Sequence, residues 1–252
     1  MNTLQLQHCI KQLINVKYPE INVTVLSCDL ALQYVLRLSK MMMMTTTMMM
    51  MKKKKKSSSS SSKNYFTSSS SSELLGTTTT TTNNNNNNNI HCLTINLDTS
   101  TNPGSHWICL LIDTNKNIIE LFDSLAIHDF YPEHVIKLIN VLVDDDGKLF
   151  NNKFKTNLKN RFQSLTTNCC GHYCALFFYH RIILKHDFET FCNLLKSKFP
   201  SFCARDCVVY ETVYKLLQNQ APSPYIPDNP SEECNCIQIC KKNNGHLTNK
   251  YD

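Results

Sequence analysis

The sequence predicts an α+β domain with a central antiparallel sheet flanked by helices. Short apolar segments with polar turns between them indicate strands at 90–97, 107–112 and 118–122. Segments with helical spacing of apolar residues follow at 132–143, 171–184, 187–198 and 204–217. Antiparallel strands in the middle of the chain, with helices gathered around them, are typical of this class.

Composition divides the 252 residues into four segments. Residues 1–40 contain one helix-like and one strand-like stretch, which are too few to build a core alone, so we interpret this segment as docking on the later domain. Residues 41–89 are mostly homopolymer runs of Met, Lys, Ser, Thr and Asn, and this composition predicts disorder. Residues 90–220 form the predicted domain, and the Pro- and Cys-containing residues 221–252 form a flexible tail.

The net charge of +6 is mostly local, because Lys52–Lys56 contribute five of these charges and leave +1 for the rest of the chain. A disordered basic run of this kind predicts weak contact with nucleic acid, without sequence preference. An expanded repeat with no selected role is at least as good an interpretation of the same run.

The chain is predicted to be intracellular, in the nucleus or cytoplasm, and not secreted. Residues 1–20 lack a continuous apolar signal core, and no apolar window of membrane-spanning length is present, so no membrane association is expected. In a reducing compartment the 13 cysteines are not a disulfide framework. A catalytic thiolate also persists there.

The cysteines near the carboxyl end offer a weak metal-site alternative. Their spacing permits zinc, but paired C-x₂-C knuckles are missing, so reduced thiols in a loose tail are favoured and neither metal nor cofactor is predicted. The residues concerned are Cys234, Cys236, Cys240 and His246, with Cys203 and Cys207 upstream.

The candidate nucleophile lies in the stretch from Asn168 to Cys174, where irregular chain gives way to a predicted helix. Backbone N–H groups at the N-terminal end of a helix stabilise a thiolate over a thiol. Gly171 leaves room for a substrate backbone to come close. The alternative is that these cysteines fill the core, as buried free cysteines commonly do. That alternative is the better one unless a base, an orienting acid and an oxyanion donor lie elsewhere.

The sequence contains a candidate base, a candidate orienting acid and a candidate oxyanion donor upstream of the cysteines. His106 precedes the second predicted strand and Asp123 follows the third, so a hairpin turn at 113–117 would bring both to one end of the ribbon. An acid there fixes the imidazole tautomer, and a neutral histidine so held takes the proton of a thiol. Gln163 lies seven residues before Cys170, where its amide is placed to donate to an oxyanion, with the Cys170 backbone N–H as second donor.

In this order and spacing, the motifs Gly-Ser-His-Trp, Phe-Asp-Ser, a preceding Gln and Cys-Gly-His-Tyr-Cys resemble one clan of cysteine peptidases. The clan includes the adenovirus proteases (adenains) and the SUMO-deconjugating proteases. The step from Gln163 to Cys170 resembles the adenain branch, since it is usually one residue shorter in SUMO proteases. Asn102–Trp107, Cys170–Cys174 and the later Arg205–Tyr210 look like the adenain-like proteases of Polinton/Maverick transposons. The resemblance covers roughly 90–217, and the N-terminal part of the family domain is not recognised.

The resemblance implies a papain-like/adenain-like fold with the nucleophile at a helix N-terminus. It implies Cys170 as nucleophile, with Cys169 as the competing candidate, His106 as general base and then acid, Asp123 as orienting acid and Gln163 as oxyanion donor. It also implies that Trp107 and Gly171 bind substrate, with the Trp107 side chain walling a narrow channel for Gly-containing backbones.

The function that follows is a cysteine-type endopeptidase acting on viral or mobile-element precursor proteins. Two alternatives are a protease of SUMO or another ubiquitin-like modifier, and a decayed transposon protein without catalytic activity.

Overall fold

A five-stranded mixed sheet forms the centre of the molecule, with the strands in sequence order. The computed structural model describes residues 3–15, 17–58, 89–101, 104–143, 154–197 and 201–218. The strands are β1 (Asn22–Ser27), β2 (Ile90–Asn96), β3 (Trp107–Asp113), β4 (Ile118–Phe122) and β5 (Phe154–Thr156). The pairs β2–β3 and β3–β4 are antiparallel as predicted. The two edge strands differ from the prediction, because β1 and β5 pair in parallel with β2 and β4.

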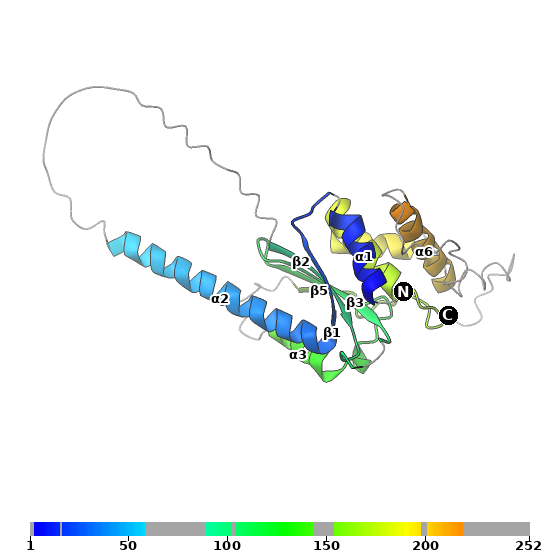
Figure 1. The fold of residues 1–252 in the computed structure, drawn as a ribbon, viewed down its shortest axis with the longest axis horizontal. Helices are drawn as coiled ribbons and strands as arrows, with labels where there is room; N and C mark the ends of the chain where they lie inside the picture. Colours follow the sequence, from blue (N-terminus) through cyan, green and yellow to red (C-terminus); the bar gives the residue numbers. More distant parts are fainter. Residues whose placement is uncertain are drawn as a thin grey trace, which may run out of the picture.

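Helices cover both faces of the sheet and make an α+β domain (Figure 1). One face packs against α1 (Thr3–Asn15), α4 (Cys170–Phe178), α5 (Phe188–Ser197) and α6 (Phe202–Gln218). The other packs against α2 (Cys28–Ser58) and α3 (Glu133–Val143). Side chains along β3 point alternately to the two faces of the sheet and contribute to a hydrophobic core on each. Cys109 and Leu111 point to the first face, and Ile108 and Leu110 point to the second. The α+β class predicted from the sequence is therefore confirmed.

Short elements join these parts and hold α4 against the sheet. The 3₁₀ turn η2 (His128–Phe130) follows β4, and α4 continues into the π-helical turn η3 (Tyr179–Ile183). Arg181 of η3 donates from Nη2 to Glu120 Oε1 of β4 at 2.7 Å, and its Nε faces the other carboxylate oxygen. Glu120 is buried, so this paired charge ties the carboxyl end of the α4 segment to the sheet.

The N-terminal residues belong to the body of the domain. Strand β1 pairs with β2 in register from Asn22 opposite His91 to Ser27 opposite Asn96. Leu6, Ile10 and Leu13 of α1 are buried in the same core as α4 and α6. A segment too short to build a core alone is thus ordered by packing on elements that come later in the sequence.

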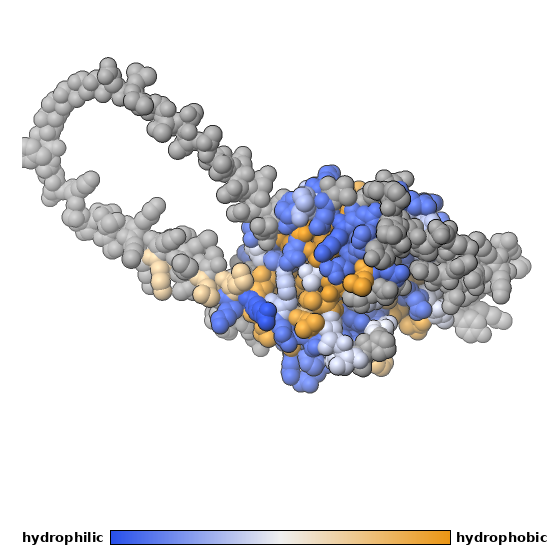
Figure 2. All heavy atoms as spheres, viewed as in Figure 1, coloured by the Kyte–Doolittle hydropathy of each residue, from blue (hydrophilic) through white to orange (hydrophobic). Residues whose placement is uncertain are grey.

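Helix α2 differs from the prediction of disorder for residues 41–89, because it continues to Ser58. Met and Lys favour helix, and the helix begins inside the core at Cys28 and propagates outward into the Met and Lys runs. Figure 2 shows apolar side chains along α2 where it leaves the body. Met41, Met44 and Met51 of this helix are exposed. The rest of the predicted disordered segment, 59–88, lies outside the described residues, as does the predicted tail 221–252.

Among the described helices, α2 included, none combines the length and the apolar character needed to cross a lipid bilayer.

Candidate active site

The β3–β4 hairpin brings His106 and Asp123 together at one end of the sheet. Cys109 pairs with Phe122 in the register, so the residue before β3 and the residue after β4 meet at the same edge. His106 Nε2 lies 2.7 Å from Asp123 Oδ1, and both side chains are buried, with 5% and 0% exposed. The structure thus places these two sequence-predicted residues in direct contact.

A set of donors fixes the Asp123 carboxylate. Its Oδ2 accepts from the Tyr131 hydroxyl at 2.9 Å and the Ile127 amide at 3.0 Å, and its Oδ1 accepts from the Leu125 amide at 2.9 Å. Burial opposes ionisation, but the hydrogen bonds and the charge of His106 outweigh it and hold the pKa of Asp123 below its usual value. Asp123 is therefore a carboxylate that stabilises positive charge on the imidazole.

Asn157 holds the backbone of Asp123 from the far side. Its Oδ1 accepts from the Asp123 amide at 2.8 Å, and its Nδ2 donates to the Asp123 carbonyl at 2.6 Å. Sequence analysis missed this residue. Asn157 lies in a polar stretch without a motif, and its contact reaches across 34 residues, so no local pattern signals it.

Cys170 is the first residue of α4, and its thiol interacts with His106. Burial lowers the pKa of His106, but hydrogen bonds and charge interactions with Asp123 and Cys170 outweigh it and raise that pKa to about 9. Because Nε2 is bonded to Asp123, Nδ1 is the ring nitrogen left for the Cys170 sulfur. The raised pKa favours the cationic imidazole, whose charge stabilises negative charge that develops on the neighbouring sulfur.

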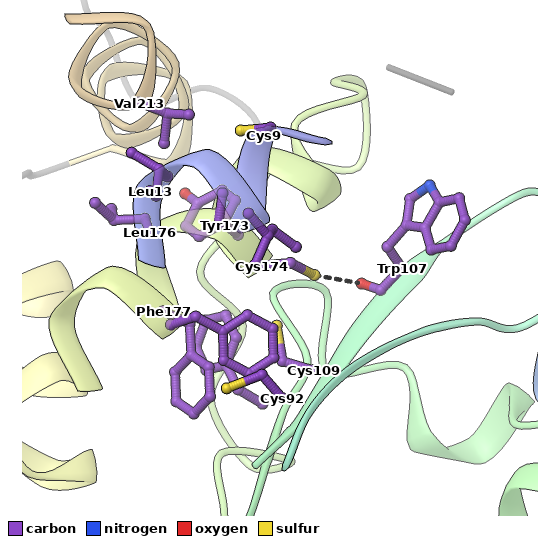
Figure 3. Packing of buried hydrophobic residues seen from close by; sticks show 14 of the residues in the cluster. Cys9, Leu13, Cys92, Trp107, Cys109, Tyr173, Cys174, Leu176, Phe177 and Val213 are labelled. Atoms are coloured by element: carbon purple, nitrogen blue, oxygen red, sulfur yellow. Dashed lines mark hydrogen bonds between the residues drawn. The ribbon is translucent and has the colours of Figure 1, made fainter. Parts of the chain in front are cut away.

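The competing nucleophile Cys169 has different surroundings. It caps α4, is 1% exposed, and its pKa is raised well above the usual thiol range by burial and by the charge of Asp206. Cys174, one turn further along α4, donates to the Trp107 carbonyl at 3.7 Å (Figure 3). This contact fastens the start of α4 to the start of β3, so the Cys170 and His106 backbones keep a fixed relation.

Gln163 lies on the loop before α4 and is held at both ends of its carboxamide. Ser124 Oγ donates to its Oε1 at 2.7 Å, and its Nε2 donates to the Thr167 carbonyl at 2.8 Å. A carbonyl only accepts hydrogen bonds, so the amide orientation is fixed. Since a carboxamide has two N–H groups, the second is the one left to face a substrate oxygen.

The two predicted substrate-binding residues lie in the first residues of β3 and of α4. Trp107 begins β3 directly after His106 and is 8% exposed, and Gly171 lies in the first turn of α4. The glycine has no side chain to obstruct an extended peptide approaching the Cys170 sulfur.

Within the described ranges, no three His, Cys, Asp or Glu side chains gather as a set able to hold a metal ion.

A thiol at a helix N-terminus beside a buried histidine–aspartate pair defines the class as a cysteine peptidase. The family model of the Ulp1 protease family, C-terminal catalytic domain, matches residues 34–213. The chain therefore belongs to the Ulp1 protease family, and its membership of the clan that includes SUMO proteases is confirmed. The match begins well upstream of residue 90, where the recognised motifs begin, and so includes most of α2. A search of curated proteins gave no match.

His172, in the first turn of α4, makes the fold sensitive to acid. Burial lowers the pKa of His172 to about 3, and its Nδ1 has no hydrogen-bond partner among the described residues. The unfolded chain binds this proton near pH 6.5 and the folded chain does not, so stability is lost as pH falls from about 6.5 towards 3.

His172→Phe keeps the ring contact with Tyr210 and removes the titration. We expect its acid-unfolding midpoint, followed by circular dichroism, to move down by at least ~0.5 pH unit. An unchanged midpoint would contradict this role.

Proposed function

We propose that this protein is a thiol endopeptidase of the adenain type in which Cys170 attacks the scissile peptide bond. The observation that carries the proposal is the 2.7 Å contact between His106 and Asp123, together with the interaction between His106 and the Cys170 thiol. A base, an orienting acid and a nucleophile in hydrogen-bonded sequence are the requirement for activated thiol chemistry.

The raised pKa of His106 sets the order of proton transfers. A raised pKa makes the His106 imidazole a better proton acceptor, so it takes the proton of Cys170 as the sulfur attacks the carbonyl carbon. His106 is therefore proposed to act first as general base and then as general acid. Charge that develops on the substrate oxygen is met by the second N–H of Gln163 and the backbone N–H of Cys170, which has no acceptor within the helix.

Collapse of the tetrahedral intermediate breaks the carbon–nitrogen bond, and His106 gives its proton to the leaving amine. The neutral imidazole then takes a proton from water, whose oxygen attacks the thioester. Breakage of the carbon–sulfur bond restores the thiolate and the imidazolium. Asp123 holds the ring in one tautomer throughout and does not itself become protonated.

The substrates we propose are precursor proteins of a virus or mobile element, cleaved at Gly-containing sites inside the cell, in the nucleus or cytoplasm. The seven-residue step from Gln163 to Cys170 and the Arg205–Tyr210 motif support the adenain-type assignment. Gly171 and the adjacent Trp107 are the residues we assign to the substrate backbone. Lys52–Lys56 are proposed to add weak, salt-sensitive contact with nucleic acid.

Deconjugation of a ubiquitin-like modifier is the second candidate, and the match to the Ulp1 family model favours it. Both activities use the same thiol chemistry, and they differ in what is recognised. A deconjugating protease binds a folded modifier and cleaves after its Gly-Gly tail, whereas a precursor-processing protease cleaves extended segments between folded parts.

Substrate profiling separates the two candidates. The purified protein is incubated with an unbiased peptide library and, separately, with a SUMO fusion ending in Gly-Gly, using Cys170→Ala as control. Cleavage of internal Gly-containing peptides without cleavage of the fusion supports the precursor protease. Cleavage of the fusion alone would transfer the assignment to the deconjugating class. No cleavage of either would support the decayed, non-catalytic alternative.

A further inference from the structure

The loop at 162–167 carries Gln163 and is fastened to helix α6 by two consecutive buried residues. Arg205 donates from Nη1 to the Phe162 carbonyl at 2.8 Å and from Nε to the Leu195 carbonyl at 2.8 Å. Asp206 is 0% exposed and faces the same loop from the next position of the helix. Neither side chain takes part in the chemistry described above.

Asp206 gathers three donors from two segments. Its Oδ2 accepts from the Thr167 hydroxyl at 2.6 Å and the Ser164 amide at 3.0 Å, and its Oδ1 accepts from the Tyr173 hydroxyl at 2.8 Å. Thr167 is also the residue whose carbonyl receives the Gln163 Nε2 at 2.8 Å. Asp206 therefore binds the side chain of the residue whose backbone carbonyl orients the proposed oxyanion donor.

Tyr173 connects this anchor with the nucleophile helix. It lies in α4, one turn after Cys170, and its hydroxyl is 2.8 Å from Asp206 and 3.0 Å from the Phe162 carbonyl. The single carboxylate therefore fixes the oxyanion loop and α4 relative to each other. A buried carboxylate that only filled space would not be expected to bind both segments.

We propose that Asp206 is a positioning residue that sets the direction of the Gln163 amide relative to the Cys170 sulfur. The proposal rests on the function proposed above. Truncation of Asp206 leaves the Ser164 amide without its acceptor and the Thr167 hydroxyl with the Ser164 carbonyl at 3.2 Å as its remaining acceptor, so the carbonyl that holds Gln163 is less firmly fixed. The contact between His106 and Asp123 lies outside that loop and is expected to remain.

This separation gives the test two readouts. Peptide hydrolysis needs the oxyanion donors, whereas displacement of iodide from iodoacetamide by the Cys170 thiolate forms no oxyanion. Asp206→Ala is expected to lower kcat by about 10²-fold, the loss typical of one oxyanion donor, with KM changed by less than about threefold. The alkylation rate of Cys170, measured by peptide mass spectrometry, should stay within about twofold of wild type.

Conservative variants keep the result interpretable. Asp206→Asn retains an acceptor for Thr167 and Ser164, while the Tyr173 hydroxyl turns to donate to Phe162 alone, so kcat is expected within about fivefold of wild type. Thr167→Val removes one hydroxyl and keeps its carbonyl, and should lower kcat by about tenfold without slowing alkylation. Glu211→Ala, at an exposed acid on the same helix, is the matched control and should change neither rate.

Parallel losses of hydrolysis and alkylation in Asp206→Ala and Thr167→Val would show a merely structural role and overturn the proposal. Unchanged kcat in Asp206→Ala would do the same. Failure of the proposed function has a different signature, because the wild type would then be alkylated at Cys170 without hydrolysing any peptide.

Discussion

Replacement of Cys170 by alanine is expected to abolish peptide hydrolysis, with kcat/KM lowered by at least ~10⁴-fold, because the Cys170 thiol is the one that interacts with His106 among the described residues. Cys169→Ala is expected to retain activity within about tenfold of wild type, since this buried thiol has a raised pKa and stays protonated. The measurement is steady-state kinetics on one fluorogenic peptide for both variants.

Each variant needs its own control for folding. Cys169 is 1% exposed, so its truncation leaves a small cavity and lowers the free energy of unfolding by about 1 kcal/mol. Thermal melts of both variants separate this effect from catalysis. Abolished hydrolysis in a folded Cys169→Ala, with activity kept in Cys170→Ala, would reverse the assignment of the nucleophile.

Asp123→Asn is expected to lower kcat by about 10²–10⁴-fold and to move the basic limb of the pH–rate profile. Burial lowers the pKa of His106, but Asp123 and Cys170 together raise it to about 9, so hydrolysis in the wild type should decline as pH rises through that value and the imidazolium is lost. Without the negative charge the imidazole deprotonates at lower pH. The decline in the variant should therefore begin at least ~1 pH unit earlier.

Tyr131→Phe is the matched control for this prediction. It removes one of the donors to Asp123 Oδ2 and leaves the carboxylate and its contact with His106 in place. We expect a fall in kcat of less than about tenfold and little movement of the basic limb. A basic limb that stays in place in Asp123→Asn would mean that the carboxylate does not control the charge of His106.

The parts of the site that follow from the sequence are those set by short-range pattern. His106 and Asp123 flank a hairpin whose turn and strands can be predicted from neighbouring residues. Antiparallel pairing of these strands then brings the two residues to one edge of the sheet. Cys170 before Gly171 at the start of a helix is likewise a local signal.

The parts that could not be predicted depend on contacts between distant segments. Asn157 and Asp206 form hydrogen bonds with residues more than 30 positions away in the sequence. Neither lies in a local sequence pattern that indicates a buried polar residue. The parallel edge pair β1–β2 is set by docking of the N-terminal segment, and parallel pairing has no turn to signal it. Helix α2 extends into a low-complexity run because its first turns are anchored in the core, which composition alone does not reveal.

We propose that His106, held by Asp123, activates the Cys170 thiol. The most direct measurement is the second-order rate of Cys170 alkylation by iodoacetamide at about pH 6.5, in the wild type and in His106→Ala. Wild-type Cys170 is predicted to react faster than the buried Cys169, and His106→Ala to slow Cys170 by at least ~10-fold. Equal rates at Cys170 in the two proteins would contradict the account.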